Sequence, residues 1–156
     1  MASPSATILL VEDDPNDVFF LQYAFEQAGI KNPLRVVEDG QGAIDYLSGN
    51  GKYADRSQFP MPCLILLDLK LPIMMGLDVL RWIKEQPDLH TLVVIVMTSS
   101  KDPTDIHQAY RLGARSYLVK PLSVHERLEV AKAIKSYWLE LNLLPHPICP
   151  TAPRPA

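Results

Sequence analysis

Two short, almost wholly apolar runs constrain the fold of this chain more than any other feature of its sequence. They are CLILL at Cys63–Leu67 and LVVIVM at Leu92–Met97. A strand with one solvent-exposed face alternates apolar and polar residues, whereas a strand covered on both faces does not. Both runs are shorter than a typical buried helix, so they predict central strands of a parallel sheet.

Further strands and helices are predicted on either side of these runs. The additional strands are expected at Thr7–Val11, Leu34–Glu38 and Arg115–Val119. The helices are expected from Asp14-Pro15 to Gly29 and at Gln41–Leu47, Leu77–Gln86, Pro103–Leu112 and Ser123–Leu141. Strands and helices alternate along the chain, which predicts an α/β fold with a doubly wound, five-stranded parallel sheet and helices on both faces.

The length of 156 residues fits one domain. We expect an N-terminal extension at residues 1–6, a domain at residues 7–143 and a Pro-rich C-terminal tail at residues 144–156, with no output domain. A polar loop at Ser48–Pro62 is longer than most connections, which makes it a candidate functional surface.

Composition and charge favour a cytoplasmic protein that binds neither nucleic acid nor membranes. The net charge of −3 and pI of about 5.8 give no electrostatic reason to expect nucleic acid. The apolar runs are far shorter than the roughly 20 residues that span a bilayer, and the N-terminus lacks the basic segment of a signal peptide. The two cysteines, Cys63 and Cys149, do not make a disulfide framework.

Polar side chains follow four of the five predicted strands. Glu12 and Asp13 follow the first strand, Asp68 the third, Thr98 the fourth and Lys120 the fifth. Ligands of open parallel sheets bind outside the carboxyl ends of the strands, so we expect these side chains in one crevice. Asp14, beside them, is interpreted as a helix cap.

This set of side chains suits phosphoryl chemistry. Clustered carboxylates need a hard cation, and Mg²⁺ prefers carboxylate and phosphate oxygens. Asp68 is then a candidate carboxylate nucleophile that forms an aspartyl phosphate, while Thr98 and Lys120 bind the remaining oxygens. Taken singly, each residue has an ordinary interpretation as a cap, a turn residue or a solvated charge. Their occurrence together is what predicts the site.

Four segments resemble the signature segments of response-regulator receiver domains. They are ILLVEDD, LLDLKLPIMMGLDVL, VIVMTSS and SYLVKP, and the resemblance extends from about Thr7 to Leu141. It implies a flavodoxin-like (βα)5 fold with strand order 2-1-3-4-5. It also implies that Asp68 is the phospho-acceptor, and that Glu12, Asp13, Asp68 and the backbone carbonyl of Lys70 bind Mg²⁺.

The resemblance further implies a two-state switch. Thr98 is the hydroxyl that bonds the new phosphoryl group, and Lys120 binds the phosphate, with a cis bond to Pro121. Tyr117 then swings inward and remodels the face formed by the fourth helix, fifth strand and fifth helix. Lys70 and Ser100 stand at the positions that set dephosphorylation in this family. Neither is an obvious water-orienting group, so slow dephosphorylation is expected.

Narrower features are similar to the response regulators paired with cyanobacterial phytochromes. These are the loop at Gly49–Pro62, the segment KSYWLELNLLP and the expected lack of an output domain. The similarity implies that the phosphoryl donor is a sensor histidine kinase, a phytochrome. It also implies a homodimer through the fourth helix, fifth strand and fifth helix, supported by the apolar residues Trp138, Leu141, Leu143 and Leu144.

Three other functions are compatible with parts of the pattern. A phosphatase of the haloacid dehalogenase type needs an acid two residues after its nucleophile, where this chain has Lys70. A flavodoxin-like electron carrier would bind FMN at Glu12–Asp17, which is acidic and repels phosphate. A pseudo-receiver that binds partners without phosphorylation stays the alternative. The chain is otherwise expected to be a switch and not a turnover enzyme.

Overall fold

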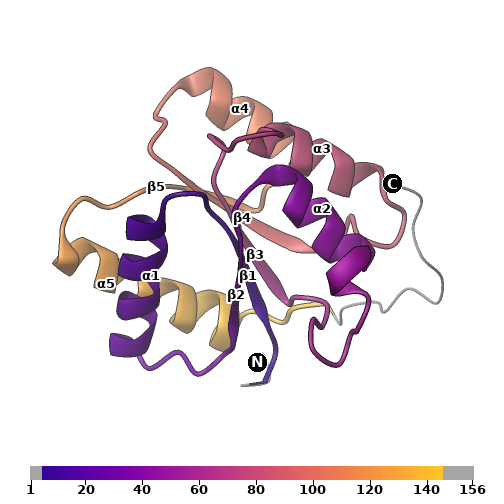
Figure 1. The fold of residues 1–156 in the computed structure, drawn as a ribbon. Helices are drawn as coiled ribbons and strands as arrows, with labels where there is room; N and C mark the ends of the chain where they lie inside the picture. The colour runs from indigo at the N-terminus through magenta and orange to yellow at the C-terminus, as the bar shows by residue number, and fades with distance from the viewer. Residues whose placement is uncertain (1–4, 146–156) are drawn as a thin grey trace.

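The computed structural model describes residues 5–145, which form one five-stranded parallel sheet with helices on both faces (Figure 1). The strand order is β2-β1-β3-β4-β5, which confirms the expected fold. The strands are β1 (Ile8–Val11), β2 (Leu34–Val37), β3 (Leu64–Leu67), β4 (Val93–Thr98) and β5 (Ser116–Val119). β1, β3 and β4 are buried along their whole length, as their unbroken apolar sequences predict.

The helices divide the core into two layers (Figure 1). α1 (Pro15–Gln27) and α5 (Val124–Ala133) pack side by side on one face of the sheet. α2 (Gly40–Ser48), α3 (Gly76–Glu85) and α4 (Pro103–Arg111) cover the other. Successive strand residues point to opposite faces, so each central strand contributes to both layers. Asp14, Asp39 and Asp102 cap α1, α2 and α4 with their carboxylates, which confirms Asp14 as a helix cap.

The last helix differs from the expectation of one continuous helix to Leu141. α5 ends at Ala133, and η2 (Ile134–Leu141) follows as a π-helix. Ile134 and Leu139 are the two buried residues of η2. They lie five positions apart, a spacing that an α-helix places on different faces and a π-helix brings onto one face. Burial of this pair therefore accounts for the change in hydrogen bonding.

The long connection between α2 and β3 is packed against the end of α2. It contains a short 3₁₀ helix, η1 (Gly51–Tyr53). The Arg56 guanidinium donates to the carbonyls of Tyr46 and Leu47 in the last turn of α2 and to the carbonyl of Phe59 within the connection.

The remaining sequence-based expectations concern the membrane, the termini and the cysteines. No helix in residues 5–145 is long and apolar enough to cross a membrane. Most of the predicted extension at 1–6 and tail at 144–156, including Cys149, lies outside the described residues. Cys63 is a buried free thiol, and burial raises its pKa to about 11.

Candidate functional site

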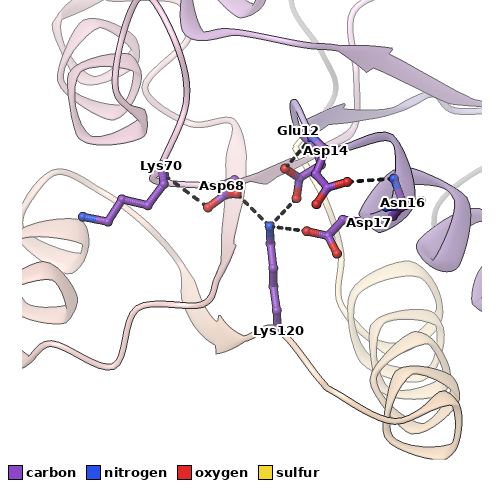
Figure 2. Close-up of polar contacts among 7 residues, drawn as sticks. All are labelled: Glu12, Asp14, Asn16, Asp17, Asp68, Lys70 and Lys120. Atoms are coloured by element: carbon purple, nitrogen blue, oxygen red, sulfur yellow. Dashed lines mark hydrogen bonds and ion pairs between the residues drawn. The ribbon is translucent and has the colours of Figure 1, made fainter.

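The carboxyl ends of β1, β3 and β5 bring three charged side chains together (Figure 2). Glu12, Asp68 and Lys120 each follow the last residue of a strand. Their backbone N–H groups donate to neighbouring strands, from Glu12 to Val37, from Asp68 to Val11 and from Lys120 to Thr98, at 2.8–3.1 Å. These bonds extend the sheet by one residue and fix where each side chain begins.

The Lys120 ammonium lies between three carboxylates. Its Nζ is 2.5 Å from Oε1 of Glu12, 2.8 Å from Oδ2 of Asp17 and 2.7 Å from Oδ2 of Asp68. Burial lowers the pKa of Lys120, but the hydrogen bonds to Asp17, Asp68 and Glu12 outweigh it, and the net shift is upward. Lys120 therefore stays charged and neutralises part of the acidic site.

Asp17 was not among the residues that the sequence predicted for the site. It lies in the first turn of α1, three positions after the cap Asp14, and its carboxylate points back toward the strand ends (Figure 2). The cap at Asp14 predicts that Asp17 lies in the first turn of α1, near the strand ends, but the direction of its side chain depends on how α1 packs.

Glu12 is almost fully buried, with 4% of its surface exposed. Burial raises the pKa of Glu12 to about 7, the hydrogen bond from Lys120 opposes the shift, and the nearby Asp68 charge adds to it. The site thus holds more negative charge than Lys120 alone offsets, which favours binding of a further cation.

Glu12, Asp13 and Asp68 form a group that fits a divalent metal. Each offers one carboxylate oxygen, and these atoms lie within 4.8 Å of one another. Asp13 is exposed, while Glu12 and Asp68 are buried, so the group opens to solvent on one side. Oxygen ligands with room for water are what Mg²⁺ and Mn²⁺ require.

Lys70 lies beside this group through its backbone. Its N–H donates to Oδ1 of Asp68 at 3.2 Å, and its side chain extends away (Figure 2). The Lys70 ammonium lies 3.8 Å from Oδ2 of Asp105 on α4. The predicted role of its carbonyl as a metal ligand stays a prediction.

Thr98, at the end of β4, is fully buried, and its Oγ1 has no hydrogen-bond partner among residues 5–145. A buried hydroxyl without a partner costs roughly 1–3 kcal/mol, which favours a ligand that supplies one. Two residues further on, the Ser100 carbonyl accepts a hydrogen bond of 2.9 Å from the Tyr117 hydroxyl. Tyr117 is half-buried, and this hydrogen bond links β5 to the connection between β4 and α4.

The expected cis bond between Lys120 and Pro121 is wrong for this structure. The described residues contain no cis peptide bond. The trans form of an X-Pro bond is favoured by about 0.5–1 kcal/mol, and Lys120 reaches all three carboxylates from it.

The fold and the site together define an α/β domain with an acidic, lysine-bearing pocket at the carboxyl edge of its sheet. The model of the family described as response regulator receiver domain matches residues 8–132. The chain belongs to this family.

Individual relatives are similar along nearly the whole chain. Response regulator Rcp1 of Synechocystis sp. is 36% identical over 144 residues, which cover 92% of this chain and 96% of Rcp1. The probable methanogenesis regulatory protein FilR2 of Methanothrix harundinacea is 37% identical over 143 residues, which cover 90% of this chain and 88% of FilR2.

Two solved structures share the fold. The Mn²⁺-bound form of Rcp1 has a TM-score of 0.81 and 36% identity, and the match covers 90% of this chain and 99% of that one. The phosphorylated cyanobacterial phytochrome response regulator RcpA has a TM-score of 0.83 and 34% identity, with the same coverage.

Proposed function

We propose that this chain is a phosphorylation switch in which Asp68 accepts a phosphoryl group from a sensor histidine kinase. The position of Asp68 carries the proposal. Its carboxylate is buried, contacts the Lys120 ammonium at 2.7 Å and belongs to the group of oxygens that fits a divalent metal. Glu12, Asp13, Asp68 and the Lys70 carbonyl are the proposed ligands of Mg²⁺.

The transfer itself is a displacement at phosphorus. A carboxylate oxygen of Asp68 forms the new bond while the bond from phosphorus to the donor histidine nitrogen breaks, and the nitrogen keeps the electron pair. When bound, Mg²⁺ neutralises the carboxylates and spreads the charge of the transferring group. Lys120 exchanges its contact with Asp68 for a phosphoryl oxygen, and Thr98 donates its unpaired hydroxyl to another.

The same contacts connect the site to a distant surface. Movement of Thr98 toward the phosphoryl group shifts the connection that begins with Ser99 and Ser100. The Tyr117 hydroxyl donates to the Ser100 carbonyl, so the shift reaches β5 and α4. We propose that this face, formed by α4, β5 and α5, changes on phosphorylation.

A homodimer through this face is part of the proposal. Exposed apolar side chains support it and are 50–91% exposed. They are Tyr110 on α4, Leu122 before α5, Leu141 at the end of η2 and Leu143 after it. Trp138 and Leu144, which the sequence also suggested for the dimer, instead pack against the core.

The proposed donor is a phytochrome histidine kinase. RcpA is described as a cyanobacterial phytochrome response regulator, and the match covers nearly the whole of RcpA. FilR2 is equally similar in sequence but is a probable methanogenesis regulatory protein. Phosphoryl transfer from a purified phytochrome kinase therefore tests the donor directly.

Intact mass after incubation with Mg²⁺ and acetyl phosphate tests the phospho-acceptor, with Asp68→Asn as the control. A gain equal to one HPO₃ group in the wild type alone supports the proposal. If neither protein gains mass although Mg²⁺ binds, the chain is a phosphorylation-independent binding module.

A further inference from the structure

The connection from β3 to α3 contains the one residue besides glycine that has a positive φ in the described chain. Ile73 has a φ of 67°, and the Met74 N–H donates to the Pro72 carbonyl across it at 2.7 Å. This is a tight three-residue turn, and a β-branched residue is strained in it. Surrounding contacts must hold the turn in place.

One of these contacts closes the connection on itself. The Gly76 N–H donates to the Leu69 carbonyl at 3.0 Å. A Cβ at Gly76 would overlap the Asp68 carbonyl oxygen and lie 2.7 Å from Cα of Leu69. The start of α3 is therefore in close contact with the backbone of Asp68 and Leu69. The α3 backbone cannot move closer to Asp68.

Gly40 makes the second contact, from a different part of the chain. It is the first residue of α2, is buried, and lacks a positive φ, so its backbone does not require glycine. A Cβ there would overlap the Met74 carbonyl oxygen and lie 2.9 Å from its carbonyl carbon. These are backbone atoms and cannot rotate away as a side chain would. Gly40 is thus required by the close approach of Met74.

We propose that Gly40 is a positioning residue for the metal site, acting through Met74 on the connection that carries Lys70. The inference rests on the proposed function, because it assigns the Lys70 carbonyl to Mg²⁺. A methyl group at position 40 displaces the Met74 backbone. Gly76 is fixed against Asp68, so the displacement is taken up between Lys70 and Met74. The Lys70 N–H, which donates to Asp68, moves as well.

A small displacement is enough to affect the metal. Mg²⁺ demands near-ideal octahedral geometry with ligands at about 2.0–2.1 Å, so a shift of a few tenths of an ångström in one carbonyl matters. Loss of groups that orient metal ligands typically weakens metal affinity by about 10–100-fold. Gly40→Ala is expected to weaken Mg²⁺ binding by about 10-fold, the lower end of that range.

The test is calorimetric titration of the unphosphorylated full chain with MgCl₂, beside thermal unfolding. Two variants on α2 serve as controls. A Cβ at Gly42 would approach only side-chain atoms, at 3.3 Å or more, so Gly42→Ala should keep the wild-type Kd. Ile44 is buried in the core under α2, so Ile44→Ala should lower Tm and keep the wild-type Kd.

The outcomes separate the inference from the proposed function. A raised Kd in Gly40→Ala alone supports positioning. A wild-type Kd in Gly40→Ala, or an equal rise in Ile44→Ala, overturns it. If the wild type does not bind Mg²⁺, the metal part of the proposed function is what fails. If Gly40→Ala does not fold, the titration is made with Ile73→Gly alone, which loosens the same turn without an overlap at position 40. A raised Kd in that variant supports the inference, and a wild-type Kd overturns it.

Discussion

The Lys120 ammonium and the Asp68 carboxylate, 52 residues apart in sequence, are in contact at 2.7 Å. Lys120 also contacts Glu12 and Asp17, so one cation holds three acids at the edge of the sheet. A phosphoryl group on Asp68 would offer this cation new oxygens. If Asp68 is the phospho-acceptor, as proposed, this contact places Lys120 beside the carboxylate that receives the phosphoryl group.

Lys120→Met is expected to destabilise the metal-free protein by about 3 kcal/mol, because removing one partner of a buried ion pair leaves the other charges uncompensated. Glu12 and Asp68 are the buried partners, at 4% and 7% side-chain exposure. Urea unfolding at pH 8 in EDTA measures the effect, with Lys132→Met as the control. Lys132 pairs with Glu129 on the exposed face of α5 and should change little. Equal effects of the two variants would contradict the prediction.

Thr98→Val is expected to leave the unphosphorylated protein as stable as the wild type or more stable by about 1 kcal/mol. The substitution keeps the shape of the side chain and removes a buried hydroxyl without a partner. After phosphorylation the same variant lacks a donor to the phosphoryl oxygen, so its response in dimerisation should be weaker. Urea unfolding and sedimentation, before and after acetyl phosphate, measure the two effects. A large loss of stability before phosphorylation would show that the hydroxyl has a partner.

Tyr117→Phe removes the hydrogen bond to the Ser100 carbonyl and keeps the ring packed against the core. The stability of the unphosphorylated protein should fall by about 0.5–1.5 kcal/mol. The phosphoryl group should still form on Asp68, since Tyr117 is not among the residues that contact it. Intact mass and sedimentation on the same samples separate the two roles. If phosphorylation changes dimerisation as in the wild type, the link through Ser100 is not part of the switch.

Sequence was sufficient where local patterns decide the structure. Each predicted strand agrees with the observed one to within one residue at either end. The runs that predicted β1, β3 and β4 are almost wholly apolar because these strands are covered on both faces. Glu12, Asp68 and Lys120 follow strand ends, and the parallel sheet then places them together. Asp17 depends on how α1 rotates as it packs, and sequence reasoning did not find it.

Two other features depend on contacts between distant parts of the chain. The π-helix at Ile134–Leu141 arises because Ile134 and Leu139 are both buried, which the α-helical pattern does not indicate. The requirement for glycine at position 40 comes from Met74. Met74 lies in the connection between β3 and α3, 34 residues later in the sequence. Neither is encoded in local propensity, so both needed the assembled structure.

Cys63 is expected to react slowly with thiol reagents at a pH where an ordinary thiol reacts fast. It is 5% exposed, and burial raises its pKa from 9.0 to about 11. A shift upward means that the reactive thiolate forms only at higher pH, so at pH 9 roughly one molecule in a hundred carries it.

The measurement is the rate of alkylation in Cys149→Ser, which leaves Cys63 as the single thiol. The same variant in urea serves as the exposed reference. The rate in the folded protein should be at least about 50-fold lower at pH 9, through the lost thiolate alone. Comparable rates in the two states would show that Cys63 is open to solvent and would contradict its place in the core.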